Sequence, residues 1–261
     1  NTASGFGSIS IANSSTIKGA TSGIIAESGS GNIKITGAGS ATGTSAYGIL
    51  ARSGGAGTVT VLSTGTVTGG KTGVIAMSTG VGNVNVLGTG NTLGSNGWGI
   101  YATSGGGNVT VAPAGTVTGN EGIYAGTALS GNVKVTVVNA VTGTTLAGIN
   151  TASASGNIDI SNSTTVLGDT SGIIAESGSG NISITGAGSA TGTTAYGILA
   201  RSGGAGTVDV LTTGSVTGGK TGVIAMSLGI GNVNVLNTGT TVGNNGWGIY
   251  ATSGGGNVTV A

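Results

Sequence analysis

The hydrophobic positions of this chain fall into short segments in which every second residue is apolar. Examples are residues 23–28 (GIIAES), 31–35 (GNIKI) and 65–69 (GTVTG), and glycine-rich stretches separate such segments. A spacing of two is the period of a β-strand, and no 3.6-residue period continues through the glycines. The pattern therefore predicts an all-β chain built from short strands.

Three such segments form a unit that recurs along the whole chain. A longer period of 149 residues, equal to six units, maps Glu27 onto Glu176 and Trp98 onto Trp247. We therefore interpret residues 1–261 as one continuous fragment, with a long repeat at 1–149 and a partial copy at 150–261. A glycine followed by Ile or Val marks the units at intervals of 23 to 26 residues: Gly23, Gly48, Gly73, Gly99, Gly122, Gly148, Gly172, Gly197, Gly222 and Gly248.

Strands this short can bury their apolar side only by stacking on the equivalent strands of neighbouring units. Equivalent strands of successive units run in the same direction, and the crossover preference makes their connection right-handed. The sequence thus predicts a three-faced, right-handed parallel β-helix of about ten coils of about 25 residues. At an inter-strand spacing of about 4.8 Å, ten coils give a rod of roughly 50 Å.

The period of two also assigns side chains to the inside or the outside of the rod. On the first face, the columns that contain Ile24 and Ala26 are expected to point inward. On the second face, Ile33 and Ile35 point inward and the intervening Lys34 points to solvent. On the third face, the residues expected inside are Ile17, Val67, Leu93, Val117 and Val141.

The outward positions of the first face are apolar, although a soluble rod usually carries polar residues there. They can form a ladder that stabilises the sheet, or they can contact another rod, another segment of the protein, or a hydrophobic or glycan surface. We favour lateral protein contact, because aliphatic residues outnumber aromatic ones in this column and a glycan-binding surface would have mostly aromatic residues. The predicted interaction stripe consists of Ile25, Leu50, Ile75, Tyr101, Tyr124, Ile174, Leu199, Ile224 and Tyr250, with Asn150 in the same column and the corner aromatics Tyr47, Trp98, Tyr196 and Trp247 nearby.

Two further sets of residues are predicted to have structural roles. Glu27 and Arg52 share one phase of consecutive coils, as do Glu176 and Arg201, so each pair should form an outward ion pair. An asparagine recurs just before the second strand, where side-chain amides can form a ladder from coil to coil, and Thr58 and Thr207 replace it in two coils. The predicted ladder is Asn32, Asn83, Asn108, Asn132, Asn157, Asn181, Asn232 and Asn257.

Composition narrows the possible functions. The chain has 59 glycines, one proline, a net charge of +1, and neither cysteine nor histidine. Without a basic stripe nucleic-acid binding is not expected, and thiolate chemistry and the usual zinc ligands are excluded. No transmembrane segment is expected, because no apolar run approaches about 18 residues. No cofactor is expected either.

Repeats such as GIIAESGSGNIKI and GVIAMSTGVGNVNV resemble the passenger domains of bacterial autotransporters and related large secreted adhesins. The resemblance covers the whole chain and rests on coil length, composition and the Gly-Asn-Val turn rather than on a catalytic signature. It implies a β-helix displayed outside a bacterial cell, as an extracellular structural rod that mediates self-association or adhesion. Its expected partners are other copies of itself or a cell or host surface. Since neither terminus shows a capping segment, we expect the natural chain to continue, or copies to stack end to end.

Two alternatives remain open from the sequence. An ice-binding face is suggested by the rows Thr66/Thr68 and Thr116/Thr118, although other coils break the pattern. A polysaccharide-active enzyme would need clustered carboxylates, and we expect no catalysis because the sequence brings no pair of them together. The carboxylates are Glu27, Glu121, Asp159, Asp169, Glu176 and Asp209.

Overall fold

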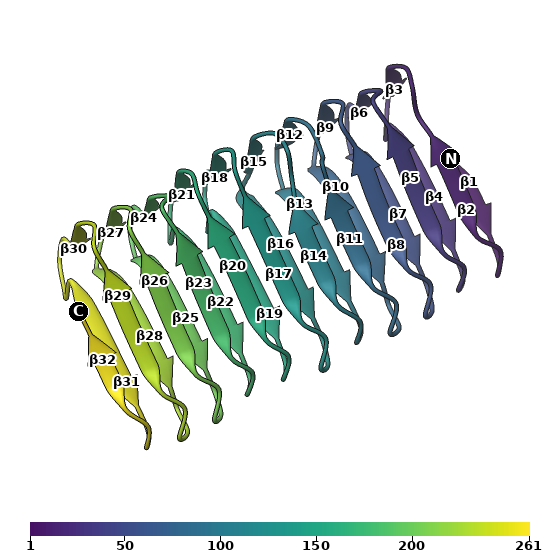
Figure 1. Cartoon of the computed structure of the whole chain (residues 1–261). Coiled ribbons are helices and arrows are strands. Elements are labelled where there is room, and N and C mark those ends of the chain that lie inside the picture. The colour runs from purple at the N-terminus through teal and green to yellow at the C-terminus, as the bar shows by residue number, and fades with distance from the viewer.

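The computed structural model describes all residues, 1–261, as a solenoid of parallel strands without a helix. It therefore contains no helix long and apolar enough to cross a membrane. Successive coils stack along one axis from the N-terminus to the C-terminus (Figure 1). The predicted β-helix with coils of about 25 residues is confirmed, and a further coil at residues 1–22, which lacks the marker glycine, precedes the first marked one.

Sheet A is the first long side of the coil and contains eleven strands. All its pairings are parallel, for example Val74 with Ile49 and Ala76 with Ala51. Its inward columns are buried, as the sequence predicts. The strands are β1 (Thr2–Ser4), β4 (Ile24–Ser28), β7 (Tyr47–Ser53), β10 (Thr72–Ser78), β13 (Trp98–Ser104), β16 (Glu121–Thr127), β19 (Ile149–Ser153), β22 (Ile173–Ser177), β25 (Tyr196–Ser202), β28 (Thr221–Ser227) and β31 (Ile249–Ser253).

Sheet B is the second long side and also contains eleven strands. Ile33 and Ile35 are buried while Lys34 is exposed, in agreement with the predicted alternation. The strands are β2 (Ile9–Ala12), β5 (Ile33–Gly37), β8 (Val59–Ser63), β11 (Val84–Leu87), β14 (Val109–Ala112), β17 (Val133–Val137), β20 (Ile158–Asn162), β23 (Ile182–Gly186), β26 (Val208–Thr212), β29 (Val233–Asn237) and β32 (Val258–Val260).

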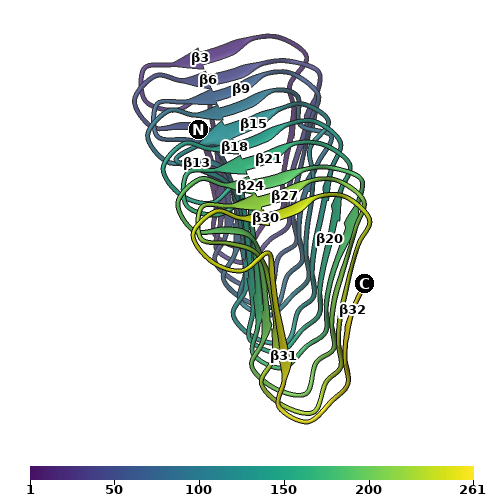
Figure 2. The same cartoon turned by 90° about the vertical axis from the view of Figure 1, so that its left-hand side faces the viewer.

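Sheet C contains ten short strands and closes the triangle as its short side (Figure 2). Its strands have three residues each, and a glycine ends every one of them. They are β3 (Ile17–Gly19), β6 (Ala41–Gly43), β9 (Val67–Gly69), β12 (Thr92–Gly94), β15 (Val117–Gly119), β18 (Val141–Gly143), β21 (Val166–Gly168), β24 (Ala190–Gly192), β27 (Val216–Gly218) and β30 (Thr241–Gly243).

One prediction for the third face is wrong. Leu93 points outward and is 39% exposed, whereas Thr92 is 2% exposed and occupies the inward column. The register pairs Thr92 with Val67 and Val117, because Gly94 aligns with Gly69. A shift of one residue moves a side chain to the other face of a strand, so the apolar character of Leu93 was misleading.

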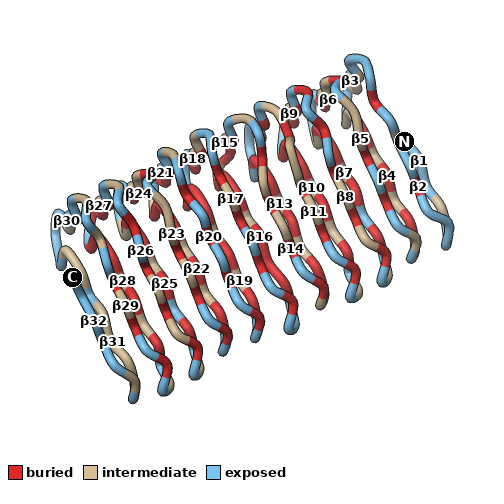
Figure 3. Tube along the Cα trace, viewed as in Figure 1, coloured by how far each residue is buried: buried red, intermediate tan, exposed pale blue.

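The core is a single apolar column inside the triangle. It comprises 44 buried residues, mostly Ile, Val and Ala, and extends from the first coils to the last. Burial is greatest in the middle of the rod and falls in the terminal coils, where one side of each strand lacks a neighbour (Figure 3). The fold therefore restricts the inward positions to small or apolar residues, whereas the residues at the outward positions can vary and take on other roles.

Candidate interaction surface

The nine residues of the predicted stripe lie in one outward column of sheet A. The strand register pairs each member with the next, and Asn150 lies between Tyr124 and Ile174. Eight of them are partly exposed, and Tyr250, in the last coil, is exposed. The side chains shield one another along the axis but leave an apolar surface, which Asn150 divides into two parts. Two aliphatic runs are present: Ile25, Leu50 and Ile75 in the first long repeat, and Ile174, Leu199 and Ile224 in the second.

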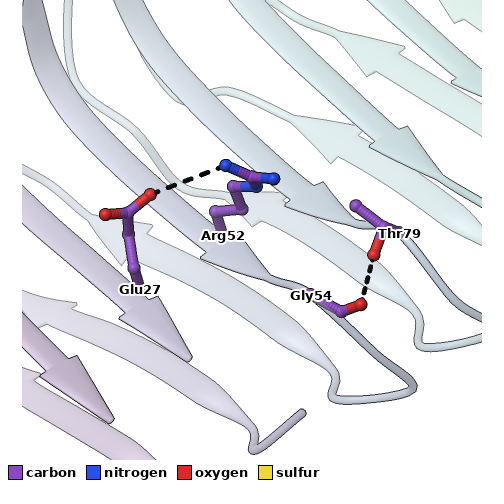
Figure 4. Close-up of polar contacts among 4 residues, drawn as sticks. All are labelled: Glu27, Arg52, Gly54 and Thr79. Carbon is purple, nitrogen blue, oxygen red and sulfur yellow. Dashed lines mark hydrogen bonds and ion pairs between the residues drawn. The ribbon is translucent and has the colours of Figure 1, made fainter. Parts of the chain in front are cut away.

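The predicted ion pairs lie on the same face, one column further along each strand. Glu27 and Arg52 approach to 3.9 Å between β4 and β7 (Figure 4). Glu176 and Arg201 approach to 2.9 Å between β22 and β25. All four side chains are between 41% and 53% exposed, so each pair contributes little to stability.

The corner aromatics lie where the chain passes from sheet C to sheet A. Tyr47 and Tyr196 are half-buried, whereas Trp98 and Trp247 are 37% and 63% exposed. Trp98 contacts Tyr101 at a centroid distance of 4.8 Å with the ring planes tilted by 56°. Tyr101 in turn stacks on Tyr124 at 5.2 Å and 12°. In the second long repeat, Trp247 and Tyr250 approach to 5.2 Å. The stripe residues Tyr101 and Tyr124 therefore form a distinct aromatic cluster with the corner residue Trp98.

Glu121 anchors this aromatic cluster, a role that sequence reasoning missed. The residue is 6% exposed, and its two carboxylate oxygens accept hydrogen bonds of 2.8 Å from Trp98 Nε1 and Asn150 Nδ2. Burial raises the pKa of the Glu121 carboxyl above its ordinary value, against the effect of the bonds from Asn150 and Trp98. Burial also raises the pKa of the Tyr124 hydroxyl, with smaller contributions from Tyr101 and Glu121.

The asparagine column lies at the corner between sheets A and B, away from the stripe. Seven bonds of 2.8 to 2.9 Å link it from coil to coil, each from a backbone N–H to the side-chain oxygen of an asparagine one coil earlier. The longest run begins at Asn83 and ends at the N–H of Thr207. The contacts are between side chain and backbone rather than between stacked amides. The asparagines therefore stabilise the turn, since their side-chain oxygens already accept hydrogen bonds from the backbone of the next coil.

A second structural column at this corner is formed by buried serines that the sequence analysis did not single out. The Ser104 hydroxyl donates to the Gly82 carbonyl of the previous coil and accepts from the Gly107 N–H, both at 2.8 Å. Ser153 and Ser177 bind their turns in the same way. The inward period of two continues through these serines after buried Ala102, Thr151 and Ala175, a signal that could have revealed them.

A second exposed apolar feature lies at the tips of the turns between sheets A and B. Val81, Leu129 and Ile230 project from these turns, and Ile230 is 76% exposed. Val81 and Leu129 lie two coils apart and face each other across Gly106, where a Cβ atom would come within 3.3 Å of both side chains. These tips are discontinuous, in contrast to the stripe.

The carboxylates of the chain form no metal-binding cluster. Asp159 and Asp209 share one outward column of sheet B with Ser183 between them, a proximity that the sequence analysis did not anticipate. Neither residue lines any hollow of the surface, and Asp209 accepts a bond of 2.6 Å from Asn234 Nδ2. No group of three or more acidic residues could hold a metal ion.

No protein-family model, curated protein or solved structure matches this chain. The arrangement of its own residues is therefore the basis for a functional interpretation.

Proposed function

We propose that this chain is a segment of an extracellular β-solenoid rod of a bacterial surface adhesin, and that copies of it associate side by side through sheet A. The observation that carries the proposal is the apolar outward column of sheet A, which the strand register makes continuous from Ile25 to Tyr124 and from Ile174 to Tyr250. Sheet B, in contrast, carries polar residues such as Lys34 and Asp159 at the corresponding central positions. An adhesin role further draws on the family resemblance of the repeats.

The size of the aliphatic runs sets the expected strength of association. Each run lies on three strands, whose whole outward face measures about 15 Å along the axis and about 20 Å along the strands, or about 300 Å², with the aliphatic side chains as one column of that face. Two such faces thus offer about 600 Å² per rod, somewhat below the roughly 800 Å² per partner of a stable interface. A single pair of contacts should be weak, and simultaneous contact through both runs should strengthen it.

The test replaces the six aliphatic residues by threonine, which suits an exposed strand position. The six are Ile25, Leu50, Ile75, Ile174, Leu199 and Ile224. We expect the original protein to form concentration-dependent assemblies in sedimentation velocity, and the substituted protein to remain folded by circular dichroism but monomeric. A matched control replaces the turn-tip residues Val81, Leu129 and Ile230 by threonine and should assemble like the original. The proposal is wrong if the original protein stays monomeric, if the variant with six threonine substitutions assembles as well as the original protein, or if only the turn-tip control no longer assembles.

The two alternatives have less support. The outward column of sheet C, which the ice-binding interpretation requires, has Thr42 and Thr68 beside Leu93, and Thr118 and Thr142 beside Leu167. An aliphatic residue thus interrupts the hydroxyl column at every third coil. Clear thermal hysteresis at micromolar protein would reverse this ranking. A polysaccharide-active enzyme would need a cleft beside a pair of carboxylates, and no hollow of the surface is lined by two acidic residues.

A further inference from the structure

The aromatic cluster of sheet A differs from the rest of the stripe in being rigidly held. Trp98 contacts Tyr101, Tyr101 stacks on Tyr124, and the Trp98 indole is tied to the Glu121 carboxylate. Glu121 is also bound by Asn150 from the neighbouring strand β19. An indole fixed in this way loses little conformational freedom when a ligand packs against it.

Glu121 is unusual for this fold. The other buried polar side chains are Ser, Thr and Asn, and Glu121 is the single carboxylate among them. Moving a carboxylate out of water is unfavourable unless it makes good hydrogen bonds, and a neutral residue at this position would avoid that cost. Departures from such local rules concentrate at functional sites. The position of Glu121 thus points to a role in holding the exposed aromatic rings.

Two shallow hollows flank the aromatic cluster. One, of about 190 Å³, lies beside Trp98 at the corner between sheets C and A. Its polar lining is Asn96, Asn120 and Glu121. The other, of about 290 Å³, lies beside the two tyrosines, where Gly126 leaves room next to the Tyr124 ring. Thr79 and Thr103 line it, and the Thr79 hydroxyl, which already donates to the Gly54 carbonyl, can still accept a hydrogen bond (Figure 4). Ring surfaces with hydrogen-bonding groups on both sides thus lie next to one another, and Glu121 is the one acidic residue in the lining.

We propose that this cluster binds neutral pyranose glycans, with one sugar ring packed against the Trp98 indole, the neighbouring sugars in contact with the tyrosine pair, and the hydroxyls bound by the flanking amides and hydroxyls. The apolar face of a pyranose fits an aromatic ring, and its hydroxyls match partners of this kind. No Lys or Arg lines either hollow, which disfavours acidic glycans and nucleic acids. A quaternary ammonium group needs ring faces that converge on a space, but Tyr101 and Tyr124 are stacked on each other at 5.2 Å. The proposal deepens the adhesive role proposed above and rests on sheet A being exposed at this cluster.

The chain has two tryptophans, which allows a direct measurement. Trp247→Phe leaves Trp98 as the only tryptophan, and its fluorescence is titrated with cellohexaose, maltohexaose, mannohexaose and chitohexaose. We expect a saturable change with at least one of them. Adding Tyr124→Ala should raise that Kd about 3- to 10-fold, the range for loss of one aromatic contact. Tyr196→Ala, four coils from Trp98, is the matched control and should leave the Kd unchanged.

Three results would overturn the glycan proposal: no neutral oligosaccharide changes the fluorescence, Tyr124→Ala binds as tightly as its parent, or only tetramethylammonium or an acidic oligosaccharide binds. The six-fold threonine variant keeps Trp98, Tyr101 and Tyr124 and is titrated in parallel. If it binds glycan but does not assemble, both proposals hold. Glycan binding by an original protein that never assembles contradicts only the lateral-contact proposal, and assembly without glycan binding contradicts only the glycan proposal.

Discussion

Substitution of a marker glycine by alanine tests the explanation of the repeat most directly. A Cβ atom on Gly122 would lie 2.4 Å from the Gly148 carbonyl oxygen and 2.6 Å from Val141 Cγ1. The same carbonyl accepts a hydrogen bond of 2.9 Å from the Ile123 N–H, so it cannot move away without loosening the link between coils. The glycine is required here by close packing of sheets A and C, since its φ is not positive.

The expected destabilisation follows from these two contacts. Overpacking by a methyl group costs about 1–3 kcal/mol. Weakening one backbone hydrogen bond adds about 0.5–1.5 kcal/mol. We therefore expect Gly122→Ala to lower the free energy of unfolding by about 2–4 kcal/mol, measured from guanidinium unfolding followed by far-UV circular dichroism. Because each coil contacts only its neighbours, amide hydrogen exchange should accelerate first in β16 and β19.

Gly106→Ala is the matched control. Its Cβ would come within 3.3 Å of the ends of Val81 and Leu129, two exposed side chains that can move aside. We expect a change below about 0.5 kcal/mol, as for ordinary surface substitutions. The packing explanation is refuted if Gly122→Ala changes stability no more than Gly106→Ala does.

Three further predictions follow from the polar contacts. Burial raises the pKa of the Glu121 carboxyl above 4.5, so the folded state binds this proton more tightly than the unfolded chain does. The free energy of unfolding should therefore fall as the pH rises from 4.5 through the raised pKa. Glu121→Gln should remove that slope in pH-dependent unfolding without loss of stability at pH 7, whereas Glu176→Gln, in an exposed pair, should leave the slope in place. Asn132→Ala should cost about 1 kcal/mol in guanidinium unfolding, and a wild-type exchange rate at the Asn157 amide would contradict the ladder bond. Arg201→Ala should cost about 0.2–1 kcal/mol at low salt and less at 1 M salt, and a salt-independent loss would argue against an ion pair.

Much of the fold could be predicted because the inward positions repeat with the strand period. Ile49 and Ala51, for example, occupy the same columns as Val74 and Ala76, and all four are buried. The error at Leu93 arose in sheet C, whose strands have only three residues and, because the last one is glycine, offer one inward side chain each. In a Thr-Leu-Gly segment, hydrophobicity alone predicts that Leu is the inward residue. The terminal glycine, which aligns with the glycines of neighbouring strands, was the better guide to register.

The aromatic cluster could be predicted only in part. The outward phase of Tyr101 and Tyr124 follows from the strand period, as does their pairing on neighbouring strands. The role of Glu121 does not follow, because one acidic residue beside a marker glycine carries no periodic signal. Its burial depends on the Trp98 and Asn150 side chains, which approach it from the two adjacent strands. Contacts of this kind depend on side-chain conformation as well as on register.

The long repeat connects the fold with the proposed surface functions. A period of 149 residues corresponds to six whole coils, so each inward residue returns to an inward column and the stacking is undisturbed. At about 4.8 Å per coil, the surface features that the two copies share, such as the aliphatic runs and the Trp98/Trp247 positions, recur after about 29 Å along the same face. The aliphatic runs and the aromatic groups consequently alternate along sheet A rather than overlapping. Lateral contact through the runs can thus leave the aromatic groups accessible, and ligands of repeating structure could engage more than one group at once.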